Sequence, residues 1–103
     1  MTIPDKLKVG GIVYEVKQIG EVDSKNANVD GQITYNLQEI LIKSTVKEDY
    51  KHQVFLHELL HAVFAHCGLE DQDESVVVRL AACLYQVLKD NDIDFRQGGQ
   101  GDE

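Results

Sequence analysis

Residues 54–64 read VFLHELLHAVF and lie inside a segment whose apolar residues recur at intervals of three, four and seven. This spacing is typical of a helix with one inward face. Upstream, Thr45 and Glu48 have the spacing of a capping box, and downstream Gly68 is a residue type that often follows the last turn of a helix. The sequence therefore predicts a helix over residues 46–66.

The middle of this helix carries His57, Glu58 and His61. Residues four apart lie about 40° apart on one helical face and roughly 6 Å along the axis, so both imidazoles can reach one ion. Zn²⁺ accepts neutral imidazole, and a glutamate beside it can take a proton from a water on the metal. The pattern therefore predicts a zinc site with two histidine ligands and Glu58 as general base. The alternative is a polar stripe that only faces solvent, although ionisable groups in so apolar a segment are costly without partners.

A third protein ligand is needed, and the residues after the motif limit which one it can be. Residues 62–67 read AVFAHC, so the glycine and third histidine of a metzincin are missing. His66 is five residues after His61, about 140° away around the helix, and is predicted to be exposed near the helix C-terminus. We therefore expect an acidic ligand after the helix, and the candidates are Glu70, Asp71, Asp73 and Glu74.

Glu74 is the favoured candidate because it continues the apolar stripe of a second predicted helix. That helix starts near Asp73 or Glu74 and stops around residues 89–92, KDND. Its predicted inward stripe consists of Val77, Leu80, Ala81, Leu84, Val87 and Leu88. Packing of this stripe on the first helix would bring Glu74 near the two histidines. The competing interpretation is that Asp71 and Glu74 form a capping box and Glu74 is only structural.

The first 43 residues have the alternation and turn residues of strands. Turn signals are Gly10-Gly11 and Asp30-Gly31. The predicted strands cover residues 7–9, 11–19, 33–35 and 39–43. We expect an α+β fold in which a small antiparallel sheet of three or four strands, ending with residues 39–43, precedes two packed helices.

The length and composition of the chain are those of a single domain. It has 103 residues, of which 43% are hydrophobic, and a net charge of −8. Residues 70–103 carry −6 of that charge, which disfavours direct nucleic-acid binding. No apolar run is long enough to cross a membrane, and residues 1–11 lack a secretory signal, so we expect a cytoplasmic protein. The domain is predicted over residues 1–92, and the acidic, glycine-rich residues 93–103 are predicted to be a disordered tail.

Cys67 and Cys83 are 16 residues apart and neither belongs to a C-x-x-C pair. Without a secretory signal, reduced and at least partly buried thiols are expected.

The segments GQITYNLQEILI, HELLHAVF and GLEDQDESVVVRLAACLYQVLKDN together resemble the short HExxH zinc peptidases encoded by phages and prophages. These are similar to the ImmA/IrrE metallopeptidases of the gluzincin type, and the resemblance covers residues 9–91. It implies one zinc ion per chain held by His57, His61 and Glu74, with Glu58 as general base. It further implies a zincin-like fold in which residues 39–43 edge the cleft and a peptide adds to that strand.

The resemblance implies a peptide or protein substrate, which in some relatives is a regulatory protein such as a repressor. From the acidic charge and the lack of a long apolar run, we expect neither nucleic acid nor membrane as a partner. A domain of this size offers few subsites, so the alternative function is a non-catalytic module that holds a host or phage protein. An oxyanion-stabilising residue is not assignable. Tyr50 shares the helical azimuth of His57 but is predicted to be a core residue, and Tyr35 and Tyr85 are no better supported.

Overall fold

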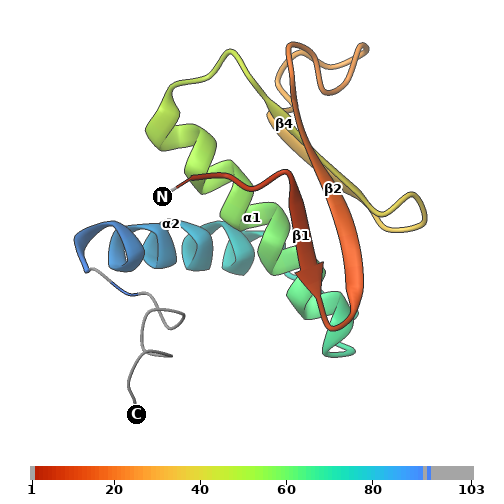
Figure 1. The fold of residues 1–103 in the computed structure, drawn as a ribbon, viewed down its shortest axis with the longest axis vertical. Helices are drawn as coiled ribbons and strands as arrows, with labels where there is room; N and C mark the ends of the chain where they lie inside the picture. Colours follow the sequence, from red (N-terminus) through yellow and green to blue (C-terminus); the bar gives the residue numbers. More distant parts are fainter. Residues whose placement is uncertain (1, 92, 94–103) are drawn as a thin grey trace.

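The computed structural model describes residues 2–91 and residue 93. Four strands come first and two helices follow, which confirms the predicted α+β class (Figure 1). The elements are β1 (Lys6–Val9), β2 (Ile12–Ile19), β3 (Gly31–Thr34), β4 (Glu39–Lys43), α1 (Glu48–His66) and α2 (Glu74–Asp90). Apart from Ile93, the predicted tail lies outside the described residues.

The sheet is mixed, with strand order β1-β2-β4-β3. β1 and β2 form an antiparallel hairpin whose turn residues, Gly10 and Gly11, have φ values of 58° and 95°. β3 and β4 are also antiparallel, whereas β2 and β4 are parallel. The expectation of a wholly antiparallel sheet was therefore wrong. The connection between β2 and β3 is long enough to cross over, so it is the second strand of the β3–β4 hairpin that pairs with β2.

This strand order also changes the position of β4. The family resemblance implied that residues 39–43 edge a cleft, but β4 has a hydrogen-bonded neighbour on each side. A substrate strand cannot add to it, because both of its edges are already paired. The free edges of the sheet belong to β1 and β3.

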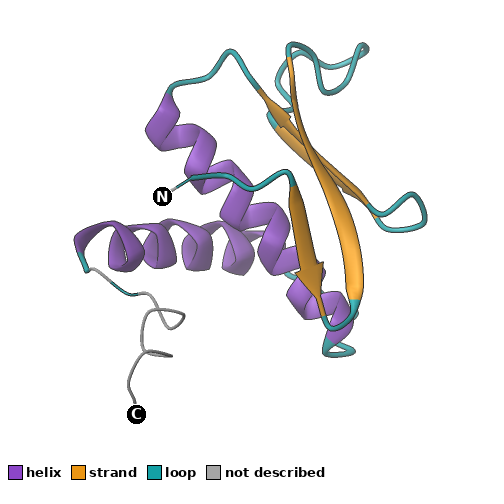
Figure 2. Cartoon of the chain, viewed as in Figure 1, coloured by secondary structure: helices purple, strands orange, loops and turns teal. Residues whose placement is uncertain are grey.

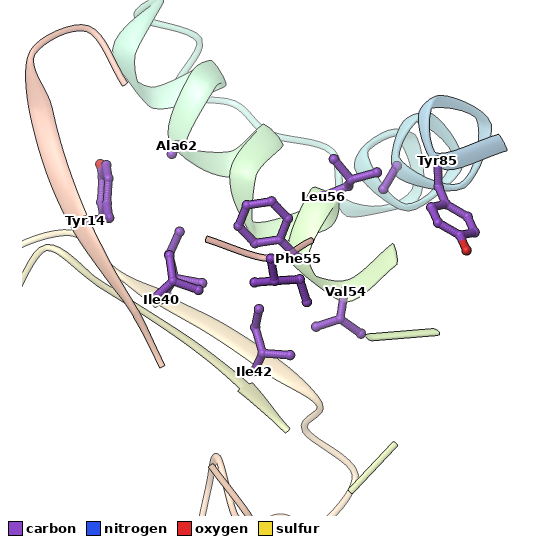
Figure 3. Packing of buried hydrophobic residues seen from close by; sticks show 11 residues of the cluster. Tyr14, Ile40, Ile42, Val54, Phe55, Leu56, Ala62 and Tyr85 are labelled. Atoms are coloured by element: carbon purple, nitrogen blue, oxygen red, sulfur yellow. The ribbon is translucent and has the colours of Figure 1, made fainter. Parts of the chain in front are cut away.

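The core lies between the sheet and α1. Ile40 and Ile42 alternate along β4 and have no exposed surface. They point toward Phe55 of α1, and Tyr14 of β2 extends the same layer, whereas Leu56 lies on the side of α1 that faces α2 (Figure 3). Full burial of each such side chain stabilises the fold by about 1.5–3 kcal/mol.

Helix α1 lies between the sheet and α2 (Figure 2). It begins at Glu48 after the N-cap residue Lys47, which has an extended backbone and no side-chain cap. The predicted capping box of Thr45 and Glu48 is therefore wrong, because residues 44–45 form the turn that leaves β4. At the other end, Gly68 has φ 80° and follows the helix as predicted.

Helix α2 packs on α1 through Val77, Ala81 and Tyr85, all of them buried. Two residues of the predicted stripe, Leu80 and Val87, are instead exposed. α1 covers only one side of α2, and the predicted stripe was wider than that contact. The remaining residues of the stripe, Leu84 and Leu88, are partly buried.

Cys67 and Cys83 are free, as expected, but both are exposed rather than partly buried. Cys67 is the C-cap residue of α1, and Cys83 lies on a side of α2 that α1 leaves uncovered. Among the described residues, no helix is long and apolar enough to cross a membrane.

Candidate metal centre

His57 and His61 present their imidazoles on one face of α1, as the four-residue spacing predicts. Their Nε2 atoms are 3.1 Å apart. Both rings are partly buried. Burial lowers the pKa of His57, and the neighbouring His61 lowers it further, whereas the carboxylate of Glu74 raises it. Lowering that pKa favours neutral imidazole, the form that binds a metal ion.

Glu74 completes the cluster from the first turn of α2. Its Oε1 lies 2.5 Å from Nε2 of His57 and 3.2 Å from Nε2 of His61. The structure therefore brings together the three residues that the sequence analysis favoured as ligands.

The competing acids have other positions. Asp73 is the N-cap residue of α2, and its side chain accepts hydrogen bonds from the backbone N–H and the hydroxyl of Ser75, at 3.0 and 2.8 Å. Those bonds lower the pKa of Asp73. Glu70 and Asp71 are exposed and do not belong to the cluster. Because Asp73 caps the helix, Glu74 is not needed for a capping box and can face the histidines.

The donor set fits zinc. Two imidazole nitrogens and one carboxylate oxygen are the protein ligands of many catalytic zinc sites, which leave a fourth position open. With metal–ligand distances of about 2.0–2.1 Å, tetrahedral ligands are roughly 3.3 Å apart, close to two of the three observed separations. The third, between His57 and Glu74, would widen by about 0.8 Å, and the Glu74 side chain is 65% exposed and free to move.

Gln72 is a residue of this site that the sequence analysis missed. Its side-chain oxygen accepts a hydrogen bond from Nδ1 of His61. That bond fixes the tautomer in which Nε2 carries the lone pair, and hydrogen bonds of this kind orient histidine ligands. No spacing rule marks Gln72 in the sequence, because it lies in an irregular segment and reaches α1 only through the tertiary fold.

Glu58 is the most deeply buried charged side chain of the site, with 7% of its surface exposed. Burial raises the pKa of Glu58 to about 7; the neighbouring Glu74 also raises it and His61 lowers it. In the part of the chain that the structure describes, no protein group donates a hydrogen bond to this carboxylate. A carboxyl group that titrates near neutrality and lacks a protein donor is suited to exchange protons with water.

The edge strand β3 reaches this carboxylate through Gly31. A Cβ atom built on Gly31 would lie 3.0 Å from Oε2 of Glu58 and 2.5 Å from Cγ1 of Val54. Gly31 was predicted to belong to a turn, but its φ is not positive. The glycine is required for space, since it lets β3 approach α1 closely at Glu58.

The hydroxyl groups of Tyr35, Tyr50 and Tyr85 are each hydrogen-bonded to a group other than the three donor atoms of the metal centre. Tyr50 is 46% exposed, not a core residue as predicted, and donates to Oδ2 of Asp30 at 2.9 Å. It has the azimuth of His57, so it faces the site rather than the sheet. Tyr35 donates to the backbone oxygen of His61 at 3.3 Å, and Tyr85 donates to Asp49.

His66 is exposed in the last turn of α1, as predicted, and lies outside the cluster. Its ring lies against Gly10 in the β1–β2 turn, where an added Cβ would be only 2.0 Å from it. The role of His66 in this structure is therefore packing between the hairpin and α1.

Comparison with known proteins gives no independent assignment, since no family model, no curated protein and no solved structure matches the chain. The proposed function therefore rests on the chemistry of the residues themselves.

Proposed function

We propose that this protein is a zinc-dependent peptidase in which His57, His61 and Glu74 hold the metal and Glu58 is the general base. The observation that carries the proposal is the buried Glu58 carboxylate next to three converging donor atoms. A site that only stabilised the fold would have no use for a buried, unpartnered carboxylate at this position, because burying it costs free energy. The glutamate donor from a second helix supports the gluzincin type that the sequence suggests.

Each residue has a distinct role in this proposal. When bound, zinc would act as a Lewis acid that polarises the scissile carbonyl and makes a water more acidic. Glu58 accepts a proton from the attacking water and then donates it to the departing amine. Gln72 holds the ring of His61 in the ligating orientation.

The substrate would lie along β3, not β4. β3 is paired with β4 on one side only, and its first residue, Gly31, lies against Glu58. An edge strand has unpaired N–H and C=O groups that an extended peptide can pair with. Pairing with β3 would place a peptide beside the Glu58 carboxylate. We also propose a reducing compartment such as the cytoplasm, because Cys67 and Cys83 are exposed and free.

The test compares wild-type protein with Glu58→Gln and His57→Ala. We expect about one zinc per wild-type chain, retention of zinc in Glu58→Gln, and its loss in His57→Ala. A peptide library should be cleaved by the zinc-loaded wild type, while Glu58→Gln should lose activity by at least about 100-fold. Equal cleavage by Glu58→Gln would contradict the role of this residue. A wild type that binds zinc and protein partners but cleaves nothing would favour the binding-module alternative.

A further inference from the structure

A hollow of about 180 Å³ lies beside the metal centre between α1 and α2. His57 forms part of its wall, so the hollow starts at one of the three donor residues. The remaining wall comes from α1 and from the outer half of the α2 contact face, and includes Tyr50, Val54, Val78, Ala81 and Ala82.

Apart from His57 and Gln53 the wall is mainly apolar, and no Asp, Glu, Lys or Arg side chain belongs to it. Ala81 and Ala82 lie side by side on α2, and the hollow is deep at this point because their side chains are small. Val78 and Tyr50 are about half exposed although they are large apolar residues. An apolar group that entered the hollow would remove part of this surface from water, which is favourable.

The size of the hollow limits what can enter. An apolar cavity of about 150 Å³ in another protein accepts benzene, so 180 Å³ is enough for one leucine or phenylalanine side chain. Tyr50, which forms one side of the hollow, is held in place because its hydroxyl donates a hydrogen bond to Asp30, the residue before β3. A charged side chain would find no Asp, Glu, Lys or Arg among the lining residues and would lose hydration on entering.

We propose that this hollow receives the side chain of the residue next to the scissile bond, and that it selects substrates with a leucine- or phenylalanine-sized apolar residue at that position. The inference rests on the proposed peptidase function and adds the substrate class. Ala82 and Val78 are then specificity-determining residues, because they set the depth and the rim of the hollow.

The test fills the hollow with Ala82→Leu. Ala82 is exposed, so the larger side chain should be tolerated by the fold. The control is Cys83→Leu, which adds a leucine at the neighbouring exposed position outside the hollow. In a peptide library, the wild type and Cys83→Leu should prefer leucine or phenylalanine next to the cleaved bond. Ala82→Leu should prefer alanine or glycine, with kcat/KM for leucine peptides reduced at least tenfold and zinc content unchanged.

A second measurement does not depend on cleavage. N-acetyl-leucine hydroxamate should bind the zinc-loaded wild type at least tenfold more tightly than N-acetyl-glycine hydroxamate, and Ala82→Leu should lose this preference. Equal affinity of the two hydroxamates for the wild type, or an unchanged library profile in Ala82→Leu, would overturn the hollow as a specificity site. Selective hydroxamate binding without any cleavage would instead contradict the peptidase activity and leave the hollow supported. A protein that takes up no zinc would overturn both proposals.

Discussion

Gln72 and His61 are joined by a hydrogen bond from the imidazole Nδ1 to the side-chain amide oxygen. This bond connects the segment before α2 to the middle of α1. It leaves Nε2 of His61 directed at His57 and Glu74, at 3.1 and 3.2 Å. The candidate metal centre therefore includes a neutral amide that is not itself among the donor atoms.

Replacing Gln72 by leucine should weaken zinc binding by about 10- to 100-fold, because His61 loses the bond that fixes its tautomer and orientation. Competition with a chelating dye would measure the change. The matched control is Gln86→Leu, since Gln86 is exposed on α2 and bonds only to Asp90 among the described residues. Affinity in Gln72→Leu equal to that of the control would show that the hydrogen bond does not support the site.

Asp73 and Glu74 are neighbours with separate roles, and alanine substitutions should separate them. Asp73→Ala should lower the free energy of unfolding by about 0.5–2 kcal/mol, because α2 loses its N-cap, while zinc affinity falls little. Glu74→Ala should abolish tight zinc binding with a smaller effect on the metal-free stability. Urea unfolding and metal titration of both variants would check this. A larger loss of zinc in Asp73→Ala would reassign the third ligand.

Gly31→Ala should destabilise the protein by about 1–3 kcal/mol, because the new methyl group would meet Val54 and Glu58 at closer than normal contact. The comparison is Gly20→Ala, at a glycine whose added Cβ meets nothing within 4 Å and whose φ is not positive. Thermal unfolding of both variants, without metal, would give the difference. If the two variants are equally stable, β3 does not approach α1 as closely as described.

Stability of the metal-free protein should depend on the titration of Glu58. Its folded-state pKa is raised to about 7 from 4.5, so the folded state holds the proton more tightly than the unfolded state does. The contribution is therefore fully favourable below pH 4.5, falls as the pH rises from 4.5 to 7, and is lost above that. The loss is about 3 kcal/mol.

The measurement is the free energy of unfolding between pH 4 and 8 for wild type and Glu58→Gln, both in excess chelator. The lowered pKa of His57 has the opposite effect, since it favours the folded state as the pH rises, and it is present in both proteins. The stability of the wild type relative to Glu58→Gln should therefore decrease across this range. A difference that does not change with pH would mean that folding does not shift the pKa of Glu58.

Local sequence patterns located most of the elements. The alternation in residues 12–19 and the spacing in residues 54–64 gave a strand and a helix within about two residues of their observed bounds. The four-residue separation of His57 and His61 was sufficient to put both rings on one face, because helical geometry is local. The apolar stripe that Glu74 continues was also informative, since packing of α2 on α1 does bring that side chain to the histidines.

Local patterns failed where a residue depends on distant neighbours. The width of the α2 stripe was overestimated, because the contact that α1 provides is not encoded in α2 itself. Tyr50 was predicted to be a core residue, although it faces the site and donates a hydrogen bond to Asp30. Strand order failed for the same reason: the pairing of β4 with both β2 and β3 is long-range, and alternation within β4 is equally compatible with an edge position.

The sequence by itself determined the two helices, the strands and the facing pair of histidines, because each follows from backbone periodicity over a few residues. Only the tertiary structure decided that Asp73 caps a helix while Glu74 joins the histidines, that Gln72 orients His61, and that β3 is the strand beside Glu58. Those choices depend on how α1, α2 and the sheet pack together. Burial of Glu58 belongs with them, because desolvation depends on every element that surrounds the carboxylate.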